Sequence, residues 1–382
     1  HSAPALPLPV TVGKKRPFRP RPNPRHIIIS AVYKYYPHSI LPTLERLKRS
    51  AAIPSPARAH LLARGYNPGR VINSGAYGLV VKATRQLDGR TVAVKIVDAV
   101  NLRSSERKMV EAEIAFLRAV KHDNVVEFID SFACEGYTFI VTEYLAGGTL
   151  LARIVQCGPM SEQEVLDLAV QIFAALEHMR ARGYSHLDIK MENLCFATKP
   201  DAKEQVIKLI DFGSVTRRSN ESDLVKAGVK LGTLYYMSPQ IVEKKAFHAH
   251  KSDMWSLGVV LYGCVSARFP FRSDNDEDTT REILQANPGF QEPQWRKTSL
   301  EFRQLVSVLL NKEEKRRPGL RLTHRTVVEM RARAHEEEAL LRHQRAERKR
   351  QSTRSSLKLP SSSGIRAPFN LFDMFRAGPV PV

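Results

Sequence analysis

The segment HLDIKMENL (residues 186–194) and the segment LIDFG (residues 209–213) decide the fold of this chain. The runs NLCF and VIKLIDF, which overlap them, predict a short pair of strands. Upstream of Gly147-Gly148 the hydrophobic pattern is mostly that of strands, and downstream it is mostly that of helices. A strand-rich part followed by a helix-rich part predicts an α+β fold with two lobes.

A glycine-rich turn, NSGAYGLV (residues 73–80), lies between two of the predicted strands. Glycines in such a turn let backbone N–H groups approach phosphate oxygens without a side chain in the way. Most glycine-rich turns are simple hairpins, so the value of this one depends on the residues that follow it.

Lys95 follows in the apolar strand VAVK (residues 92–95). A buried lysine needs an anionic partner, and the phosphates of a nucleotide would supply one. Glu113, on a helix predicted over residues 104–120, can hold the ammonium in place. Glu106 and Glu111 lie nearby, but the apolar residues that follow Glu113 indicate that it faces a core.

These features together resemble the eukaryotic protein kinases. HLDIKMEN resembles the catalytic loop H-R-D-x-K-x-x-N of that family, and Asp211-Phe212-Gly213 is its D-F-G motif, in the same order and spacing. Matches at GT (232–233), SPQ (238–240), DMWSLG (253–258) and RRP (316–318) extend the resemblance over about residues 66–330. It implies a kinase domain over residues 65–335, with a strand-rich N-lobe (65–145) and a helical C-lobe (146–335).

The resemblance also implies a role for each matching residue in transfer of a phosphoryl group from ATP with Mg²⁺. Asp188 would orient the substrate hydroxyl, and Lys190 would steady the γ-phosphate. Asn193 and Asp211 would hold Mg²⁺, while Lys95, paired with Glu113, would hold the α- and β-phosphates. The residues implied to contact ATP are Ile72, Asn73, Ser74, Gly75, Ala76, Tyr77, Gly78, Leu79, Val80, Ala93, Lys95, Glu143, Leu145 and Cys195.

A stack of Leu117, Phe128, His186 and Phe212, anchored by Asp253, would mark the active arrangement. For each apolar member the alternative is an ordinary core residue.

Four positions depart from the family pattern, and one of them, Met191 in place of a proline, looks tolerable. Asn73 replaces the first glycine of the turn, and we expect a small loss because asparagine tolerates a positive φ better than most residues. Leu187 replaces an arginine that in the family binds a phosphate on the activation loop, so we expect activity without phosphorylation of that loop. Gln240 replaces a glutamate whose partner would be Arg317, which leaves a hydrogen bond without its charge-assisted part.

Lys190, two residues after Asp188, and the pair Gly232-Thr233 resemble the serine/threonine type of the family, which implies serine and threonine as phosphate acceptors in protein substrates. The runs ARGY (63–66), WSLGVVLY (255–262) and FPF (269–271) are similar to calcium/calmodulin-dependent-kinase-like enzymes, including the testis-specific serine kinases. Glu192 matches a position that meets a substrate arginine in several basophilic kinases, although a generic role is equally consistent with it. The preferred substrate sequence therefore stays open.

The formal net charge of +20 is carried mainly by the two ends of the chain. Residues 1–67 hold 12 Lys and Arg against one acid, residues 321–382 hold 13 against six, and the middle holds 34 against 32. We expect residues 1–64 to be a basic Pro/Arg-rich extension, partly disordered, and residues 336–382 to be a charged helix and a Ser-rich disordered tail. Basic ends suit anionic partners, nuclear import or solubility.

The four cysteines have no paired spacing, which argues against disulfides or a zinc site and for a reducing compartment. No apolar run approaches a membrane span, and the first residues do not resemble a secretory signal. We therefore expect a cytoplasmic protein, with the nucleus as the alternative compartment. In the C-terminal tail the segment from Phe369 to Phe375 is an apolar cluster that could dock onto a partner as a helix.

Two other function classes stay open on the sequence alone. A pseudokinase-like scaffold is favoured by the departures at Asn73, Leu187 and Gln240 and opposed by the complete set of charged residues. A nucleic-acid-binding protein is suggested by the isoelectric point near 9.9, but it is unlikely because the middle of the chain is nearly neutral and carries no base-reading motif.

Overall fold

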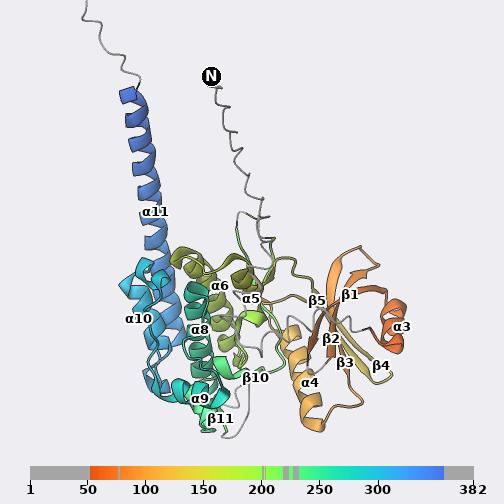
Figure 1. Cartoon of the computed structure of the whole chain (residues 1–382). Coiled ribbons are helices and arrows are strands. Elements are labelled where there is room, and N and C mark those ends of the chain that lie inside the picture. Colours follow the sequence, from red (N-terminus) through yellow and green to blue (C-terminus); the bar gives the residue numbers. More distant parts are fainter. Residues whose placement is uncertain are drawn as a thin grey trace, which may run out of the picture. The chain divides into compact units, whose positions relative to one another are not determined.

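The computed structural model describes residues 52–75, 78–199, 202, 204–217, 223–226 and 232–356, the last six as helical backbone only. The chain divides into two compact units, His1–Arg331 and Ala332–Val382. The first unit holds a strand-rich part followed by a helical part (Figure 1). The predicted α+β class with a strand-rich N-lobe and a helical C-lobe is therefore confirmed.

The N-lobe is built on a five-stranded antiparallel sheet with the order β1-β2-β3-β5-β4. Its strands are β1 (Tyr66–Gly75), β2 (Gly78–Arg85), β3 (Thr91–Asp98), β4 (Phe128–Cys134) and β5 (Tyr137–Glu143). Lys95 of β3 lies opposite Val80 of β2 and Ile140 of β5. Directly opposed residues share a face of a sheet and alternate residues return to it, so Ala93 lies on the same face as Lys95.

Helix α3 (Ser55–Ala63) covers the other face of this sheet (Figure 1). Ala57 and Leu61, one helical turn apart, are completely buried. They share a core cluster with the residues of the strands that point away from Lys95: Val81, Ala83, Val92, Val94, Ile96, Phe139 and Val141. The last part of the stretch expected to be a partly disordered extension is thus a packed helix.

Helix α4 (Ser104–Ala119) lies between β3 and β4 in the chain and packs against β4. Its buried side is Val110, Glu113, Phe116 and Leu117, which recur at the spacing of one helical face. At its start the Glu106 carboxylate accepts a hydrogen bond from the Arg103 N–H at 2.8 Å. The helix ends one residue before the predicted position.

The C-lobe is organised around α8 (Ala249–Ser266), which is buried along almost its whole length. A helix surrounded by protein on all sides is apolar all round, and α8 is largely so from Met254 onward, while its start carries His250, Lys251 and Asp253. The other helices are α5 (Leu150–Cys157), α6 (Glu162–Ala181), α7 (Pro239–Val242), α9 (Asp276–Gln285), α10 (Leu300–Leu309) and α11 (Leu320–Ser356). In the first unit α11 buries Val327 and Met330, and Arg331 pairs with Asp167 of α6 at 2.6 Å.

Short strands place the segments that carry the chemistry. The predicted pair around NLCF and VIKLIDF is confirmed as β8 (Leu194–Phe196) and β9 (Ile207–Leu209), which form a three-stranded sheet with β6 (Gly148–Thr149). Two further pairs join β7 (Tyr184–Ser185) to β10 (Thr216–Arg217) and β11 (Leu224–Val225) to β12 (Phe247–His248). The 3₁₀ turns are η1 (Met191–Asn193), η2 (Leu234–Tyr236), η3 (Pro293–Lys297) and η4 (Glu314–Arg316).

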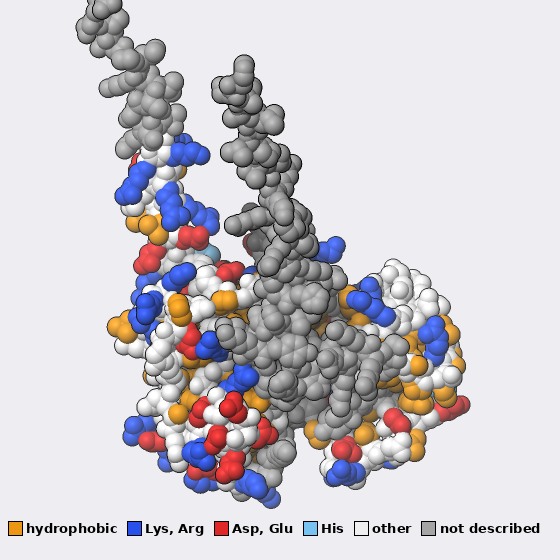
Figure 2. Space-filling model, viewed as in Figure 1, with side chains coloured by type: hydrophobic (Ala, Val, Ile, Leu, Met, Phe, Trp, Pro, Cys, Tyr) orange, Lys and Arg blue, Asp and Glu red, His pale blue; other side chains and the backbone are white. Residues whose placement is uncertain are grey.

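Acidic and basic side chains are interspersed on the face of the described surface seen in Figure 2. Acids gather over α9, whose first turn holds Asp276, Glu277 and Asp278. Among the described helices none combines the length and the apolarity that a membrane crossing requires.

Candidate active site

Lys95, Glu113 and Asp211 meet between the sheet, α4 and the DFG segment. The Lys95 ammonium Nζ lies 2.9 and 2.8 Å from the two carboxylate oxygens of Glu113 and 3.1 Å from Oδ1 of Asp211. Burial alone would lower the pKa of Lys95, but the two carboxylates outweigh it and raise the pKa, so the ammonium stays charged. The predicted partner of Lys95 is therefore the one that contacts it.

Asp188, Lys190 and Asn193 form the second cluster, on the catalytic loop. One carboxylate oxygen of Asp188 accepts from Lys190 Nζ at 2.7 Å and from Asn193 Nδ2 at 2.9 Å. Asn193 Nδ2 also donates to the Asp188 carbonyl at 3.0 Å. The 3₁₀ turn η1 produces this arrangement, because it folds Asn193 back over the backbone of Asp188. The three side chains therefore have fixed positions relative to one another.

The catalytic loop is attached to α8 through Asp253. Its two carboxylate oxygens accept hydrogen bonds from the backbone N–H groups of His186, at 2.9 Å, and Leu187, at 2.7 Å. Asp253 is almost fully buried, and burial raises its pKa to about 7 although both hydrogen bonds act to lower it. Leu187 adopts the left-handed backbone conformation, with φ of 61°, and the hydrogen bonds from Asp253 hold it there.

Two members of the predicted stack, His186 and Phe212, lie against each other, and Phe116 adds a further ring beside Phe212. The ring centroid of Phe212 lies 5.0 Å from that of His186, and Leu117 is buried. Phe128 is half-buried and lies under the Arg118 guanidinium, 5.7 Å from its carbon. Phe116, which the sequence analysis treated only as core, lies 4.3 Å from Phe212 by ring centroids. Its place next to Leu117 in the sequence is a signal that could have identified it.

The glycine-rich turn joins β1 to β2, and Ala76 and Tyr77 at its tip lie outside the described residues. Ser74 pairs with Leu79, and Gly75 pairs with Gly78. At Gly78, where φ is 144°, a Cβ atom would stand 1.9 Å from the carbonyl oxygen of Ile96. Glycine is therefore required here by contact with β3, in addition to any approach of phosphate.

The expectation that Asn73 adopts a positive φ is wrong. Asn73 is an extended residue of β1 opposite Val80, and the described non-glycine residues with positive φ lie elsewhere. Its side-chain oxygen Oδ1 accepts from the Ser74 N–H at 2.8 Å. Asparagine thus serves this position through a local hydrogen bond, which is a common use of the residue beside turns. Ile72 lies next to it, at an irregularity in the pairing of β1 with β2.

The residues predicted to enclose the adenine come from four elements. Val80 and Ala93 lie on the Lys95 face of the sheet, and Cys195 lies on β8 opposite Thr149. Burial raises the pKa of the Cys195 thiol to about 12, and its Sγ donates to the Gly148 carbonyl at 3.2 Å. This thiol is therefore an apolar packing group and not a nucleophile.

Glu143 ends β5 and begins the connection to the C-lobe, with Leu145 two residues further on. Its carboxylate accepts from Lys208 Nζ of β9 at 2.6 Å and from the Glu127 N–H at 2.8 Å. The Glu143 side chain is thus engaged with protein, which leaves the backbone of the connection to meet a nucleotide. Lys208 was missed by the sequence analysis, since nothing in its local pattern marks it.

The residues predicted to hold Mg²⁺ carry suitable donor atoms. The Asn193 amide nitrogen is used by Asp188, so its amide oxygen is the atom that would bind a metal, and Asp211 offers a carboxylate. Mg²⁺ prefers oxygen ligands and is often held by one or two carboxylates plus substrate phosphates. The donor set therefore fits the ion.

Gln240 accepts a hydrogen bond from Arg317 on its side-chain oxygen at 2.5 Å, as predicted. Arg317 is almost fully buried, and its guanidinium also donates to the carbonyls of Asn311 and Lys251, each at 2.9 Å. Burial lowers the pKa of Arg317 to about 10. The guanidinium is thus well supplied with hydrogen bonds, but none of these partners carries a charge.

Comparison with known proteins identifies the family. A model of the "Protein kinase domain" family matches residues 66–329. A calcium/calmodulin-dependent protein kinase of Metarhizium anisopliae is 34% identical over 255 residues, which cover 66% of this chain and 64% of that protein. A probable myosin light chain kinase of Dictyostelium discoideum is 32% identical over 256 residues, covering 65% of this chain and 63% of that protein.

The human serine/threonine-protein kinase Nek5 is 34% identical over 262 residues, which cover 67% of this chain and 35% of that protein. The chain thus spans less than two thirds of the length of these relatives. Their names confirm the predicted resemblance to serine/threonine kinases, including those of the calcium/calmodulin-dependent type. With more than half of its residues matched by the family model, the chain belongs to the protein kinase family.

Proposed function

We propose that this protein transfers the γ-phosphate of ATP to serine and threonine hydroxyls of protein substrates, with Mg²⁺ as cofactor. One observation carries the proposal: the two charged clusters are assembled with direct hydrogen bonds. Phosphoryl transfer depends on positioning and charge stabilisation more than on covalent help from the enzyme. Bound Mg²⁺ would neutralise the phosphate oxygens.

Each residue contributes through its own contacts. Lys95 is held by Glu113 at a fixed position on the sheet, where its ammonium can meet phosphate oxygens. Asp188 keeps one carboxylate oxygen on Lys190 and Asn193, so its orientation toward a substrate hydroxyl is fixed. Lys190 brings a positive charge next to that carboxylate, where a transferring phosphoryl group would gain from it.

Transfer of ³²P from ATP to a serine/threonine peptide library tests the activity. We expect transfer by the wild type with Mg²⁺, and loss of transfer on addition of EDTA. Asp188→Ala and Asp211→Ala should each lower the rate by on the order of 10³-fold or more, since the first removes the group that orients the substrate hydroxyl and the second a group that would hold Mg²⁺. A folded wild type that transfers nothing would favour the pseudokinase-like scaffold instead.

We further propose that activity does not require phosphorylation of the activation loop. The supporting observation is that Leu187, in place of the arginine, belongs to an apolar cluster with Met237, Ile241 and Phe247. An apolar side chain packed in this way cannot receive a phosphate.

Removal of phosphate from the purified protein tests this second proposal. We expect phosphatase treatment to leave the transfer rate unchanged, and substitution of Thr216, Ser219 and Ser222 together by alanine to leave it at a similar level. Ser219 and Ser222 lie outside the described residues. A collapse of the rate after either treatment would refute the proposal.

A further inference from the structure

The activation segment, defined here as the chain between Asp211 and Gln240, is attached to the C-lobe at Asp223. Strand β11 begins directly after Asp223 and pairs with β12, with Leu224 opposite His248. The Asp223 carbonyl accepts from the Ala249 N–H at 3.0 Å. Residues 223–225 of the segment are therefore fixed to β12 and the start of α8 by their backbone.

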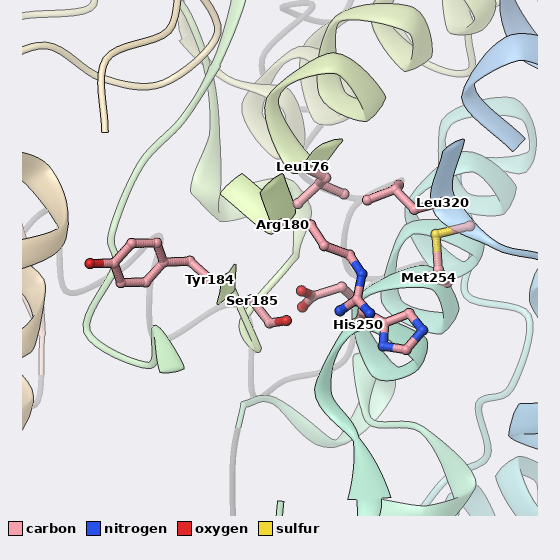
Figure 3. A pocket seen from close by; sticks show the side chains of 8 residues that line it. Leu176, Arg180, Tyr184, Ser185, His250, Met254 and Leu320 are labelled. Atoms are coloured by element: carbon pink, nitrogen blue, oxygen red, sulfur yellow. The ribbon is translucent and has the colours of Figure 1, made fainter. Parts of the chain in front are cut away.

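The Asp223 carboxylate adds three contacts from two other elements. Its Oδ2 accepts from Arg180 Nη1, at the end of α6, at 2.8 Å. The same oxygen contacts the ring nitrogen Nδ1 of His250 and accepts from the His250 N–H at 3.3 Å. Figure 3 shows the Arg180 and His250 side chains coming together from separate elements at a pocket that Ser185 also lines. The Asp223 side chain is only 7% exposed.

A carboxylate this deeply buried needs strong partners, because loss of water costs it far more than it costs a neutral group. Burial alone would raise the pKa of Asp223, but the hydrogen bonds from His250 and Arg180 outweigh it and lower the pKa to about 2. Burial lowers the pKa of His250. At neutral pH Asp223 is thus ionised, with hydrogen bonds from Arg180 and from His250 and with the guanidinium of Arg180 as an opposing charge.

We propose that Asp223 is a built-in anion that holds the activation segment in place, in the way that a phosphate held by the missing catalytic-loop arginine would. Arg180 and His250 are then positioning residues for phosphoryl transfer. The proposal rests on the proposed kinase activity. This role of Asp223 explains how the activation segment is held at residue 223 although position 187 is not an arginine. Because the anion is a side chain of the chain itself, no phosphorylation is needed to supply it.

Arg180 also connects this anion to the catalytic loop. It lines the same pocket as Asp253, whose carboxylate holds the backbone of His186 and Leu187. The positive charge of Arg180 acts to lower the pKa of Asp253, which burial raises. The Arg180 guanidinium therefore stabilises two carboxylates: that of Asp223 on the activation segment, and that of Asp253, which orients the catalytic loop. Loss of Arg180 should for that reason cost more than loss of Asp223.

Steady-state kinetics of the full chain after phosphatase treatment test the proposal, with KM measured separately for ATP and for a peptide. Asp223→Asn keeps the size of the side chain and removes its charge, so kcat/KM for the peptide should fall on the order of tenfold, with KM for ATP unchanged. Asp223→Glu should retain more activity than Asp223→Asn, and Arg180→Ala should lose more. Asp276→Ala, an exposed acid on α9, is the matched control.

A charge-swapped pair, Asp223→Arg with Arg180→Asp, should regain activity over either single variant. Amide hydrogen exchange at residues 224 and 225 should rise in Asp223→Asn, while thermal unfolding shows that the variant is folded. Wild-type kinetics or wild-type exchange in Asp223→Asn would overturn the proposal. A wild type without transfer would contradict the proposed function, and the exchange measurement would then still decide whether Asp223 holds the segment.

Discussion

Leu187 shows how one residue can change while the backbone around it is kept. Its φ of 61° is unfavourable for a residue with a Cβ atom, at a cost on the order of 1 kcal/mol. Asp253 offsets this cost with hydrogen bonds to Leu187 and to His186. The leucine side chain adds burial in the cluster with Met237, Ile241 and Phe247. The catalytic loop therefore keeps its conformation although its usual charge at this position is gone.

Gln240 has a less favourable effect, because it gives the buried guanidinium of Arg317 a neutral hydrogen-bond partner in place of a carboxylate. Burial and then the charge of Arg317 lower the pKa of Lys312 to about 7. We predict that Gln240→Glu stabilises the protein by roughly 1–2 kcal/mol, since a carboxylate strengthens the bond to Arg317. The gain is limited because the variant loses the hydrogen bond from Gln240 Nε2 to the Lys312 carbonyl, now 2.7 Å long.

Thermal unfolding at several pH values checks this prediction. The pKa of Lys312 is lower in the folded protein than its ordinary value of 10.5. The charge of Lys312 therefore lowers the free energy of unfolding by its full amount below about pH 7, and this destabilisation decreases as the pH rises and is gone above pH 10.5. The gain from Gln240→Glu should therefore be largest near pH 7 and shrink toward pH 10. The exposed Gln285→Glu is the control, and an equal shift in both variants would contradict the prediction.

The charged residues of the candidate site could be predicted because their types and spacing form a recognisable pattern. Residues outside that pattern could not. Asn73 was expected to adopt a positive φ, but the hydrogen bond from the Ser74 N–H to its side chain suits an extended residue. Lys208 reaches the site only through the packing of β9, which the sequence does not display, whereas Phe116 lies next to Leu117 on α4 and could have been included.

At the scale of elements, α3 is a helix that the sequence did not indicate. Proline and arginine dominate the residues before it, and this composition suggested partial disorder up to residue 64. The helix itself is short, and its stability comes from the sheet that it covers. The strands and α4 were easier to predict, because apolar residues recur along most of their length, at every second residue in the strands and at every third or fourth residue in the helix.

We predict that Leu61→Ala lowers the free energy of unfolding by about 2–5 kcal/mol, because it leaves a cavity between α3 and the sheet. Leu62→Ala is the matched control on the same helix, since Leu62 is 43% exposed, and its effect should stay within about 0.5 kcal/mol. Chemical denaturation of both variants measures the difference. Equal effects would show that α3 does not pack on the sheet in solution.

At the scale of the whole chain, the residues that carry most of the net positive charge are not those of the candidate active site. All the described members of the two charged clusters lie between Lys95 and Asp211. Residues 1–51 and 336–382 together hold 19 Lys and Arg and six acids, which is most of the net charge of +20. The attraction of the protein to polyanions and its catalysis should therefore be separable.

We predict that a chain limited to residues 52–335 keeps its transfer rate on a neutral peptide and elutes from heparin at much lower salt. It retains α3 and the ion pair between Arg331 and Asp167, which the first unit needs for packing. Binding to a polyanion depends on the number of cations that displace counterions, so the salt dependence of retention should fall along with the affinity.

The control is the full chain on a strongly acidic peptide, where the basic ends should lower KM at low salt only. A loss of transfer by the shorter chain on the neutral peptide, with its unfolding temperature preserved, would show that the basic ends take part in catalysis itself.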